Sequence, residues 1–232
     1  MVNMMNSSQR NHWSSRYDGP RRRSALTFGG RPLTLEHPAD PERLLNDPEI
    51  LRRNAEDDYM PYWAFLWPGA FLLGEALAMR NWTGQEVALE IGCGLGLAGL
   101  AALRAGIGKV VFTDYDEAPL SFIASSAAAN GLSEDRYVLQ RLDWRDLPDE
   151  TYDVIFGADV LYERRLVPLV ANLMRRMLTP DGYALVAGPF RVATEDLGRV
   201  LSDVGLKSES SPIAAIDERG NPVRGTVHRI WR

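Results

Sequence analysis

The chain has 232 residues, 45% of them hydrophobic, with 26 basic and 31 acidic side chains and a formal net charge of −5. This length suits one large domain, which can bury a full core without covalent cross-links. A mildly acidic balance argues against nucleic acid as the partner, because domains that bind nucleic acid usually carry a basic surface.

Cysteine count and hydropathy exclude several classes of protein. Cys93 is the single cysteine, so no internal disulfide can form and no zinc-ligand pattern is present. No apolar run approaches the roughly 18 residues of a membrane span. The N-terminus lacks the apolar stretch of a signal peptide. We therefore expect a cytoplasmic protein with no metal site and no membrane contact, and the oligomeric state stays open.

Three regions are expected along the chain. Residues 1–25 are polar with little periodicity, which predicts a disordered tail. Its arginine run, Arg21 to Arg23, is either solvated or a docking arm for an acidic surface. Residues 26–80 are expected to form an N-terminal extension that packs on the catalytic domain, and residues 81–232 to form that domain.

The extension has its own local patterns. Residues 26–28 and 33–35 alternate like short strands, and residues 42–54 could form a helix. An aromatic-rich segment follows over residues 61–68. Its last residue, Pro68, suits the first turn of another helix.

Strand and helix patterns alternate from residue 87 onward. Strands are expected over residues 87–91, 110–113, 137–140, 154–156, 183–187 and 227–231, with helices over 97–105, 117–129, 166–178 and from Thr194 to Gly205. Asp116 is the expected N-cap of the second helix, and residues 180–182 are an expected turn. This alternation predicts an α/β fold, a doubly wound and mostly parallel sheet with helices on both faces.

A glycine-rich turn follows the first of these strands. It reads Glu90-Ile-Gly92-Cys-Gly94-Leu-Gly96. Glycines at such a strand end let the backbone turn tightly and approach a ligand, and the N–H groups of the next helix can donate to it. When the dinucleotide fingerprint G-x-G-x-x-G is counted from Gly92, its third glycine position is occupied by Leu97. The register instead matches the nucleoside-binding turn of methyltransferases.

Acidic residues end the next two strands. Asp114 lies about 20 residues past the glycine turn, where a carboxylate can accept hydrogen bonds from ribose hydroxyls, of a nicotinamide dinucleotide as well as of a nucleoside. Asp143 can accept from the exocyclic amine of adenine, and Trp144 can stack on the base. The alternative for this pair is a surface turn with a core tryptophan.

Asp159 and Tyr162 follow the fourth strand. In a methyltransferase this position lies beside the expected methyl donor. A carboxylate and a phenol there suit a positively charged amine, Asp159 by its charge and Tyr162 by its hydroxyl or by cation–π contact. Since a carboxylate stabilises the charged amine, the expected role of Asp159 is binding and orientation. The alternative is a helix-capping Asp and a buried Tyr.

The sequence resembles a known family. The stretches that carry the resemblance are Pro61–Pro68, Leu89–Gly96, Thr113–Asp116, Leu142–Trp144 and Gly157–Tyr162. They are similar to the seven-β-strand methyltransferases of family 16, which includes many protein lysine methyltransferases, and the likeness covers about residues 26–232.

The resemblance implies a Rossmann-like, seven-stranded fold and S-adenosylmethionine as cofactor. The implied cofactor-binding residues are Gly92, Gly94, Asp114 and, for adenine, Asp143, with Trp67 packed over the cofactor edge and Asp159 and Tyr162 near the substrate. From their places in the glycine turn and beside Asp143, Glu90, Gly96 and Trp144 are expected to bind the cofactor as well. The chain departs from the flavoprotein-directed enzymes of this family at Gly188-Pro-Phe-Arg191, where those tend to read Asp-Pro-Gly-Arg.

These observations favour methyl transfer to an amine, and above all to a protein lysine. Two alternatives stay open at this point: an N-methyltransferase for a small, nicotinamide-like acceptor, and a nicotinamide-dependent oxidoreductase. A non-catalytic binding module would not need Asp159 and Tyr162. No Asn-Pro-Pro-Tyr motif is present, which argues against an adenine or glutamine amino group as the acceptor.

Overall fold

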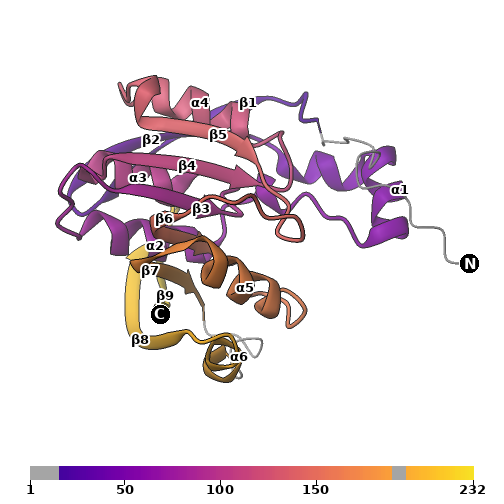
Figure 1. Ribbon diagram of the computed structural model, residues 1–232. Helices are drawn as coiled ribbons and strands as arrows, with labels where there is room; N and C mark the ends of the chain where they lie inside the picture. The colour runs from indigo at the N-terminus through magenta and orange to yellow at the C-terminus, as the bar shows by residue number, and fades with distance from the viewer. Residues whose placement is uncertain (1–15, 190–196) are drawn as a thin grey trace, which may run out of the picture.

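The protein is described by a computed structural model that covers residues 16–189 and 197–232 (Figure 1). Its centre is a seven-stranded sheet with strand order β5-β4-β3-β6-β7-β9-β8. Strands β3 to β7 run parallel, whereas β9 is antiparallel to both β7 and β8. The strands are β3 (Val87–Ile91), β4 (Lys109–Asp114), β5 (Tyr137–Arg141), β6 (Tyr152–Ala158), β7 (Leu178–Gly188), β8 (Lys207–Ile216) and β9 (Pro222–Trp231).

Helices cover both faces of this sheet. One core cluster joins the sheet to α2 (Pro68–Ala78), α3 (Leu97–Ala105) and α4 (Leu120–Ala129), and the other joins it to α5 (Val167–Met177) and α6 (Leu197–Asp203). The faces alternate along β3, since Ala88 belongs to the first cluster and Leu89 to the second. The expected Rossmann-like, mostly parallel fold is confirmed.

A two-stranded hairpin packs outside the first helical layer. Strand β1 (Arg21–Phe28) pairs antiparallel with β2 (Arg31–Pro38). The boundary of the tail expected at residue 25 differs from the structure, because residues 21–25 belong to β1. Residues 1–15 of that expected tail lie outside the described residues. The hairpin buries Leu26, Leu33 and Leu35 in the core that α2 and α3 share.

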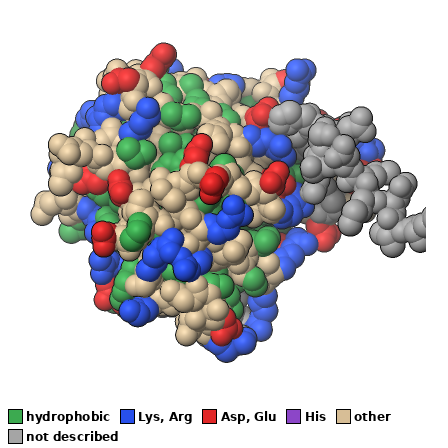
Figure 2. Space-filling view, in the orientation of Figure 1, with side chains coloured by type: hydrophobic (Ala, Val, Ile, Leu, Met, Phe, Trp, Pro, Cys, Tyr) green, Lys and Arg blue, Asp and Glu red, His purple; other side chains and the backbone are tan. Residues whose placement is uncertain are grey.

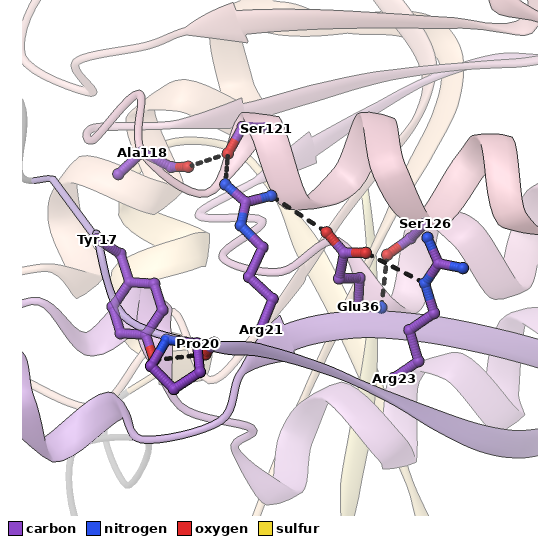
Figure 3. Close-up of polar contacts among 8 residues, drawn as sticks. All are labelled: Tyr17, Pro20, Arg21, Arg23, Glu36, Ala118, Ser121 and Ser126. Carbon is purple, nitrogen blue, oxygen red and sulfur yellow. Dashed lines mark hydrogen bonds and ion pairs between the residues drawn. The ribbon is translucent and has the colours of Figure 1, made fainter.

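The arginines of β1 bind an acidic residue of the same hairpin. Arg21 and Arg23 each lie 3.1 Å from a carboxylate oxygen of Glu36, which is buried (Figure 3). Burial would raise the pKa of Glu36, but hydrogen bonds from Arg21, Arg23 and Ser125, together with the charge of Arg23, outweigh burial and lower it. Arg21 also lies 4.0 Å from the ring centre of Phe122 in α4. Charge pairing, which apolar periodicity does not report, therefore orders the start of β1.

The outer edge of β2 is hydrogen-bonded to α4. The Asn130 side chain accepts from the Thr34 N–H at 2.9 Å and donates to the Thr34 carbonyl at 2.6 Å. The Glu36 N–H donates to the Ser126 hydroxyl at 2.8 Å. These side chains at the end of α4 act as a partner for the backbone groups that β2 turns away from β1.

Three local expectations differ from the structure. Helix α4 begins at Leu120, so Asp116 is not its N-cap; Asp116 instead accepts from the Ala118 N–H within a turn. The expected turn at residues 180–182 lies within β7, at a register shift opposite β6. Strand β8 was not expected, since polar residues and Pro212 interrupt its pattern. Thr194, the expected cap of α6, lies outside the described residues.

The described part of the chain contains no helix that is both long and apolar enough to span a membrane. Within residues 16–189 and 197–232, no three His, Cys, Asp or Glu side chains are grouped closely enough to hold a metal ion. Figure 2 shows acidic and basic side chains interspersed over one face of the molecule, with no continuous basic surface there.

A chain shortened to begin at Ala25 should be less stable. It lacks Arg21 and Arg23 and the strand pairing of residues 21–24 with β2, so the Glu36 carboxylate loses both arginine partners. We expect the free energy of unfolding to fall by roughly 2 kcal/mol, within the cost of a buried unsatisfied polar group. For a domain of this size that lowers Tm by about 4–8 °C.

Calorimetric melting would measure this change. Glu36→Gln in the shortened chain is the matched control, because it removes the unpaired charge and should restore part of the loss. Equal melting of the shortened and full chains would contradict the stabilising role of the Arg21–Arg23 segment.

Candidate active site

The glycine-rich turn connects β3 to α3 at the carboxyl edge of the sheet. Gly92, Gly94 and Gly96 have φ angles of 56°, 49° and 71°, which disfavour any residue with a side chain. The Cys93 N–H donates to the Thr113 carbonyl of β4 at 2.9 Å, so the turn is tied to the neighbouring strand.

The three glycines have different neighbours. A Cβ atom on Gly92 would lie 3.1 Å from Val160 and 3.3 Å from the Trp144 ring. A Cβ atom on Gly94 would lie 3.5 Å from the Trp63 carbonyl oxygen. On Gly96 it would lie 2.8 Å from Ile123, inside the packing of α3 against α4. The loops after β5 and β6 and the aromatic-rich segment therefore all meet at Gly92 and Gly94.

Glu90, in β3, contacts the first turn of α3. Its carboxyl group is fully buried beneath α3 and accepts a hydrogen bond from the Gly99 N–H at 3.1 Å. Burial raises its pKa well above the ordinary value. The N-cap of α3 is Gly96, which has no side chain to cap the helix, so Glu90 takes over one of the N–H groups of the first turn.

Asp114 ends β4 beside the turn. One carboxylate oxygen accepts from the Gly94 N–H at 2.9 Å and the other from the Asp116 N–H at 3.0 Å. Burial raises the pKa of Asp114 to about 6, although these backbone hydrogen bonds oppose the shift. Asp114 therefore lies next to the glycine turn in the structure, as its place at the end of the second strand led us to expect.

Asp143 is held by a neighbouring arginine. Arg145 lies 2.8 Å from each of its carboxylate oxygens, and these hydrogen bonds lower the pKa of Asp143 against the effect of burial. The guanidinium of Arg145 also lies 5.5 Å from the ring centre of Tyr115, which is exposed directly after Asp114. Sequence reasoning missed Tyr115 and Arg145, although both flank residues that it selected.

The loop after β6 begins with a residue in an unusual backbone conformation. Asp159 has a φ of 53°, and its carboxylate accepts from the Gly69 N–H at 2.6 Å. Gly69 lies in the first turn of α2. Asp159 therefore caps a helix, as the alternative interpretation of this residue expected, and that helix is α2.

Tyr162 lies three residues further on and is only partly buried. Its ring is 5.6 Å from the Tyr62 ring, which in turn is 5.8 Å from the Trp67 ring. All three side chains are between 37% and 39% exposed. Burial of the phenol, together with the nearby charges of Glu163 and Asp114, raises the pKa of Tyr162 to about 12. Tyr162 is therefore an uncharged phenol at neutral pH.

The aromatic-rich segment runs along this edge of the sheet from the end of α1 (Pro48–Asp57) to α2. The Tyr59 hydroxyl donates to Asp116, and the Trp67 indole N–H donates to the Tyr62 carbonyl at 2.8 Å. The Trp63 ring packs 5.8 Å from that of Phe122 in α4. Figure 1 shows α1 beyond the end of the sheet toward which β4 and β5 point.

A cavity of about 540 Å³ lies at the opposite edge of the sheet. Arg80, Trp82, Asp153 and Tyr183 are among the residues that line it. Ligands of such sheets bind beyond the carboxyl ends of the strands. The glycine turn, rather than this cavity, therefore marks the candidate active site.

A family model described as lysine methyltransferase matches residues 63–196, more than half of the chain. The chain belongs to this family. The matched region contains the aromatic-rich segment from Trp63, the glycine turn and the loops after β4, β5 and β6. Membership and fold imply S-adenosylmethionine as the methyl donor.

Individual relatives are methyltransferases as well. Over 133 residues the chain is 28% identical to the electron transfer flavoprotein beta subunit lysine methyltransferase of Xenopus laevis, covering 55% of this chain and 52% of the relative. Over 153 residues it is 26% identical to the ribosomal protein L11 methyltransferase of Photobacterium profundum, covering 65% and 48%. The chain spans about half the length of these relatives.

A solved structure is similar in fold. The ribosomal protein L11 methylase from Lactobacillus delbrueckii subsp. bulgaricus superposes with a TM-score of 0.53 at 19% identity, covering 69% of this chain and 76% of that one.

The residues at the carboxyl edge fit S-adenosylmethionine. Gly92 and Gly94 provide backbone that a Cβ atom would obstruct, and both have positive φ angles. Asp114 presents a carboxylate beside them. Trp144 contributes a flat apolar ring within 3.3 Å of the Gly92 Cβ position. A nucleoside with ribose hydroxyls and an aromatic base matches this combination of groups.

The affinity for S-adenosylmethionine should fall as the pH decreases through about 6. The ionised carboxylate of Asp114 can accept two hydroxyl hydrogen bonds, whereas the protonated group loses an acceptor site, and its pKa is about 6. Calorimetric titration between pH 5 and 8 measures this. Asp114→Asn should bind more weakly by roughly 1–3 kcal/mol at neutral pH and lose this pH dependence.

The ligand-free protein should respond in the opposite sense. The pKa of Asp114 is raised from its ordinary 3.8, so the folded state binds the proton more tightly than the unfolded state. The free energy of unfolding contributed by this group falls as the pH rises between those two values.

For the ligand-binding prediction, an affinity for S-adenosylmethionine that stays constant down to pH 5 would contradict the contact with Asp114.

Proposed function

We propose that this protein is an S-adenosylmethionine-dependent methyltransferase whose acceptor is an amine, a lysine side chain of a protein. The observation that carries the proposal is the exposed ring trio of Tyr62, Trp67 and Tyr162 beside the glycine turn. The two segments that carry these rings both contact that turn, through Trp63 at Gly94 and Val160 at Gly92.

The cofactor would be held by residues of four loops. Gly92 and Gly94 would give it backbone contacts, Gly96 would let α3 start close to it, and Asp114 would accept from the ribose hydroxyls. Asp143 and Trp144 would bind the adenine, and Trp67 would pack on the cofactor edge. Glu90 supports this site from below through its hydrogen bond to Gly99. When bound, the cofactor supplies a sulfonium methyl group that is already electrophilic.

The protein must then present an amine with a lone pair. A lysine ammonium has none, and its reference pKa is about 10.4. Transfer from water to a site walled by aromatic rings disfavours the charged form and lowers that pKa. The faces of Tyr62 and Tyr162 can first bind the ammonium by cation–π contact. With a pKa of about 12, Tyr162 is not a base at neutral pH and acts as a ring and as a hydrogen-bonding phenol.

Several features favour a protein acceptor over a small molecule. The ring trio is open to solvent, so it can admit a side chain that remains attached to a folded partner. The flavoprotein-directed and ribosomal-protein relatives are named for protein substrates. The glycine register argues against the oxidoreductase alternative. A cytoplasmic location stays a prediction from the sequence.

Gly94→Val should abolish binding of S-adenosylmethionine. Valine is strongly disfavoured at a φ of 49°, and its branched side chain would occupy space where the backbone must approach the ligand. Calorimetry would show no binding heat, while circular dichroism checks that the variant is folded. Gly198→Ala is a matched control, since a Cβ atom there meets no neighbour within 4 Å. Normal affinity in the Gly94 variant would remove the turn from the cofactor site.

Incubation with methyl-labelled cofactor and cell lysate tests the acceptor. We expect label in protein bands and, after hydrolysis, in methylated lysine. Tyr162→Ala should lower kcat/KM for the acceptor up to roughly thirtyfold, which corresponds to a cation–π contribution of about 2 kcal/mol. Tyr162→Phe keeps the ring and should lose much less.

The affinity of both Tyr162 variants for the cofactor should match that of the unaltered protein. Label found in acid-soluble metabolites, with no protein band labelled, would contradict the protein acceptor and support a small-molecule amine instead.

A further inference from the structure

We propose that Asp159 is a positioning residue. Its carboxylate accepts a hydrogen bond from the Gly69 N–H, and this bond keeps the rings of Tyr62 and Trp67 in contact with Tyr162. The inference rests on the proposed function, because the ring trio is the proposed acceptor site. It differs from the sequence-based expectation that Asp159 binds the acceptor amine by charge.

The first observation is the geometry of the contact. Helix α2 begins with Pro68, which has no N–H, so the first N–H that the helix offers belongs to Gly69. Trp67, the N-cap residue, makes no side-chain capping bond. Asp159 supplies the missing acceptor from 90 residues away, at 2.6 Å. This is the position that an N-cap side chain normally serves.

The second observation is the fit between the two backbones. A Cβ atom on Gly69 would lie 2.4 Å from the Asp159 carboxylate and 2.8 Å from the Ala187 carbonyl oxygen. Only glycine therefore lets the carboxylate approach so closely. The Asp159 N–H donates to that same carbonyl of β7 at 2.9 Å. Together these contacts hold the start of α2 against the ends of β6 and β7. We call the contacts among Gly69, Asp159 and Ala187 the clamp.

The third observation is the backbone of Asp159. A φ of 53° is uncommon for a residue with a side chain, although Asp tolerates it better than most. Such a conformation persists only where surrounding contacts determine it. Here it directs the chain so that Val160 meets Gly92 and Tyr162 meets Tyr62.

The clamp is connected directly to the ring trio. Trp67 immediately precedes the first turn of α2, and its indole N–H donates to the Tyr62 carbonyl at 2.8 Å. A shift of that turn therefore moves Trp67 and Tyr62 together. Tyr162 is carried by the chain that leaves Asp159. A single residue thus fixes both sides of the Tyr62–Tyr162 contact.

Three variants separate positioning from charge. Asp159→Asn keeps an oxygen that can accept from Gly69 but removes the charge. Asp159→Ala removes the acceptor. Gly69→Ala keeps the charge but displaces the carboxylate, because the new methyl group occupies its place. Gly198→Ala is the matched glycine control.

Positioning predicts that Asp159→Ala and Gly69→Ala lose roughly 10- to 100-fold in kcat/KM for the acceptor, as misplacement of reacting groups does. Asp159→Asn should retain activity within about threefold of the unaltered protein, because the amide oxygen still accepts from Gly69 and only the charge that strengthened the hydrogen bond is lost. If Asp159→Asn falls as far as Asp159→Ala while Gly69→Ala remains active, the charge acts on the acceptor and the proposal is overturned.

An NMR measurement on the full chain needs no acceptor. The Gly69 amide proton should be protected from exchange in the unaltered protein and in Asp159→Asn, and unprotected in Asp159→Ala. Contacts between the Tyr62 and Tyr162 rings should disappear with it. Ring contacts that persist in Asp159→Ala would refute the clamp. Absence of methyl transfer with an intact clamp would refute only the proposed function.

Discussion

A hydrogen bond of 2.9 Å from the Gly94 N–H to the Asp114 carboxylate joins the ends of the two central strands β3 and β4. It requires the left-handed backbone of Gly94, and it directs the turn back over the sheet edge. The same turn brings Gly92 next to Val160 and Trp144, and Gly94 next to Trp63. The loops that surround the candidate site therefore meet beside this contact, where the partly buried carboxylate of Asp114 accepts hydrogen bonds from two backbone N–H groups.

Local patterns were sufficient to predict most of the fold. Strand β3 and helix α3 have the expected bounds, because apolar runs and a terminal Gly106 define them within a few residues. The position of Asp114 beside the glycine turn also followed from the sequence, since adjacent parallel strands end at a common edge. To predict that two residues at strand ends are neighbours, one needs only the order of the strands along the chain and the fact that they run parallel.

Contacts between distant residues were not predictable in the same way. Gly69 and Asp159 are 90 positions apart, and only the meeting of α2 with β6 brings them together. The pairing of Arg21 and Arg23 with Glu36 required knowledge of the hairpin register. Asp116, by contrast, was misassigned because its turn with Ala118 has the same chemistry as a helix cap. Charge and hydrogen bonding order these segments, and periodicity of apolar residues does not report either.

The docking of β2 on α4 bears on the behaviour of the protein at high concentration. A strand with an unpaired edge offers backbone donors and acceptors on which a strand of another molecule can grow, and this is a route to aggregation. Asn130 and Ser126 bind those groups at Thr34 and Glu36. Along β2, these two side chains at the end of one helix therefore occupy backbone groups on which a strand of another molecule could otherwise pair.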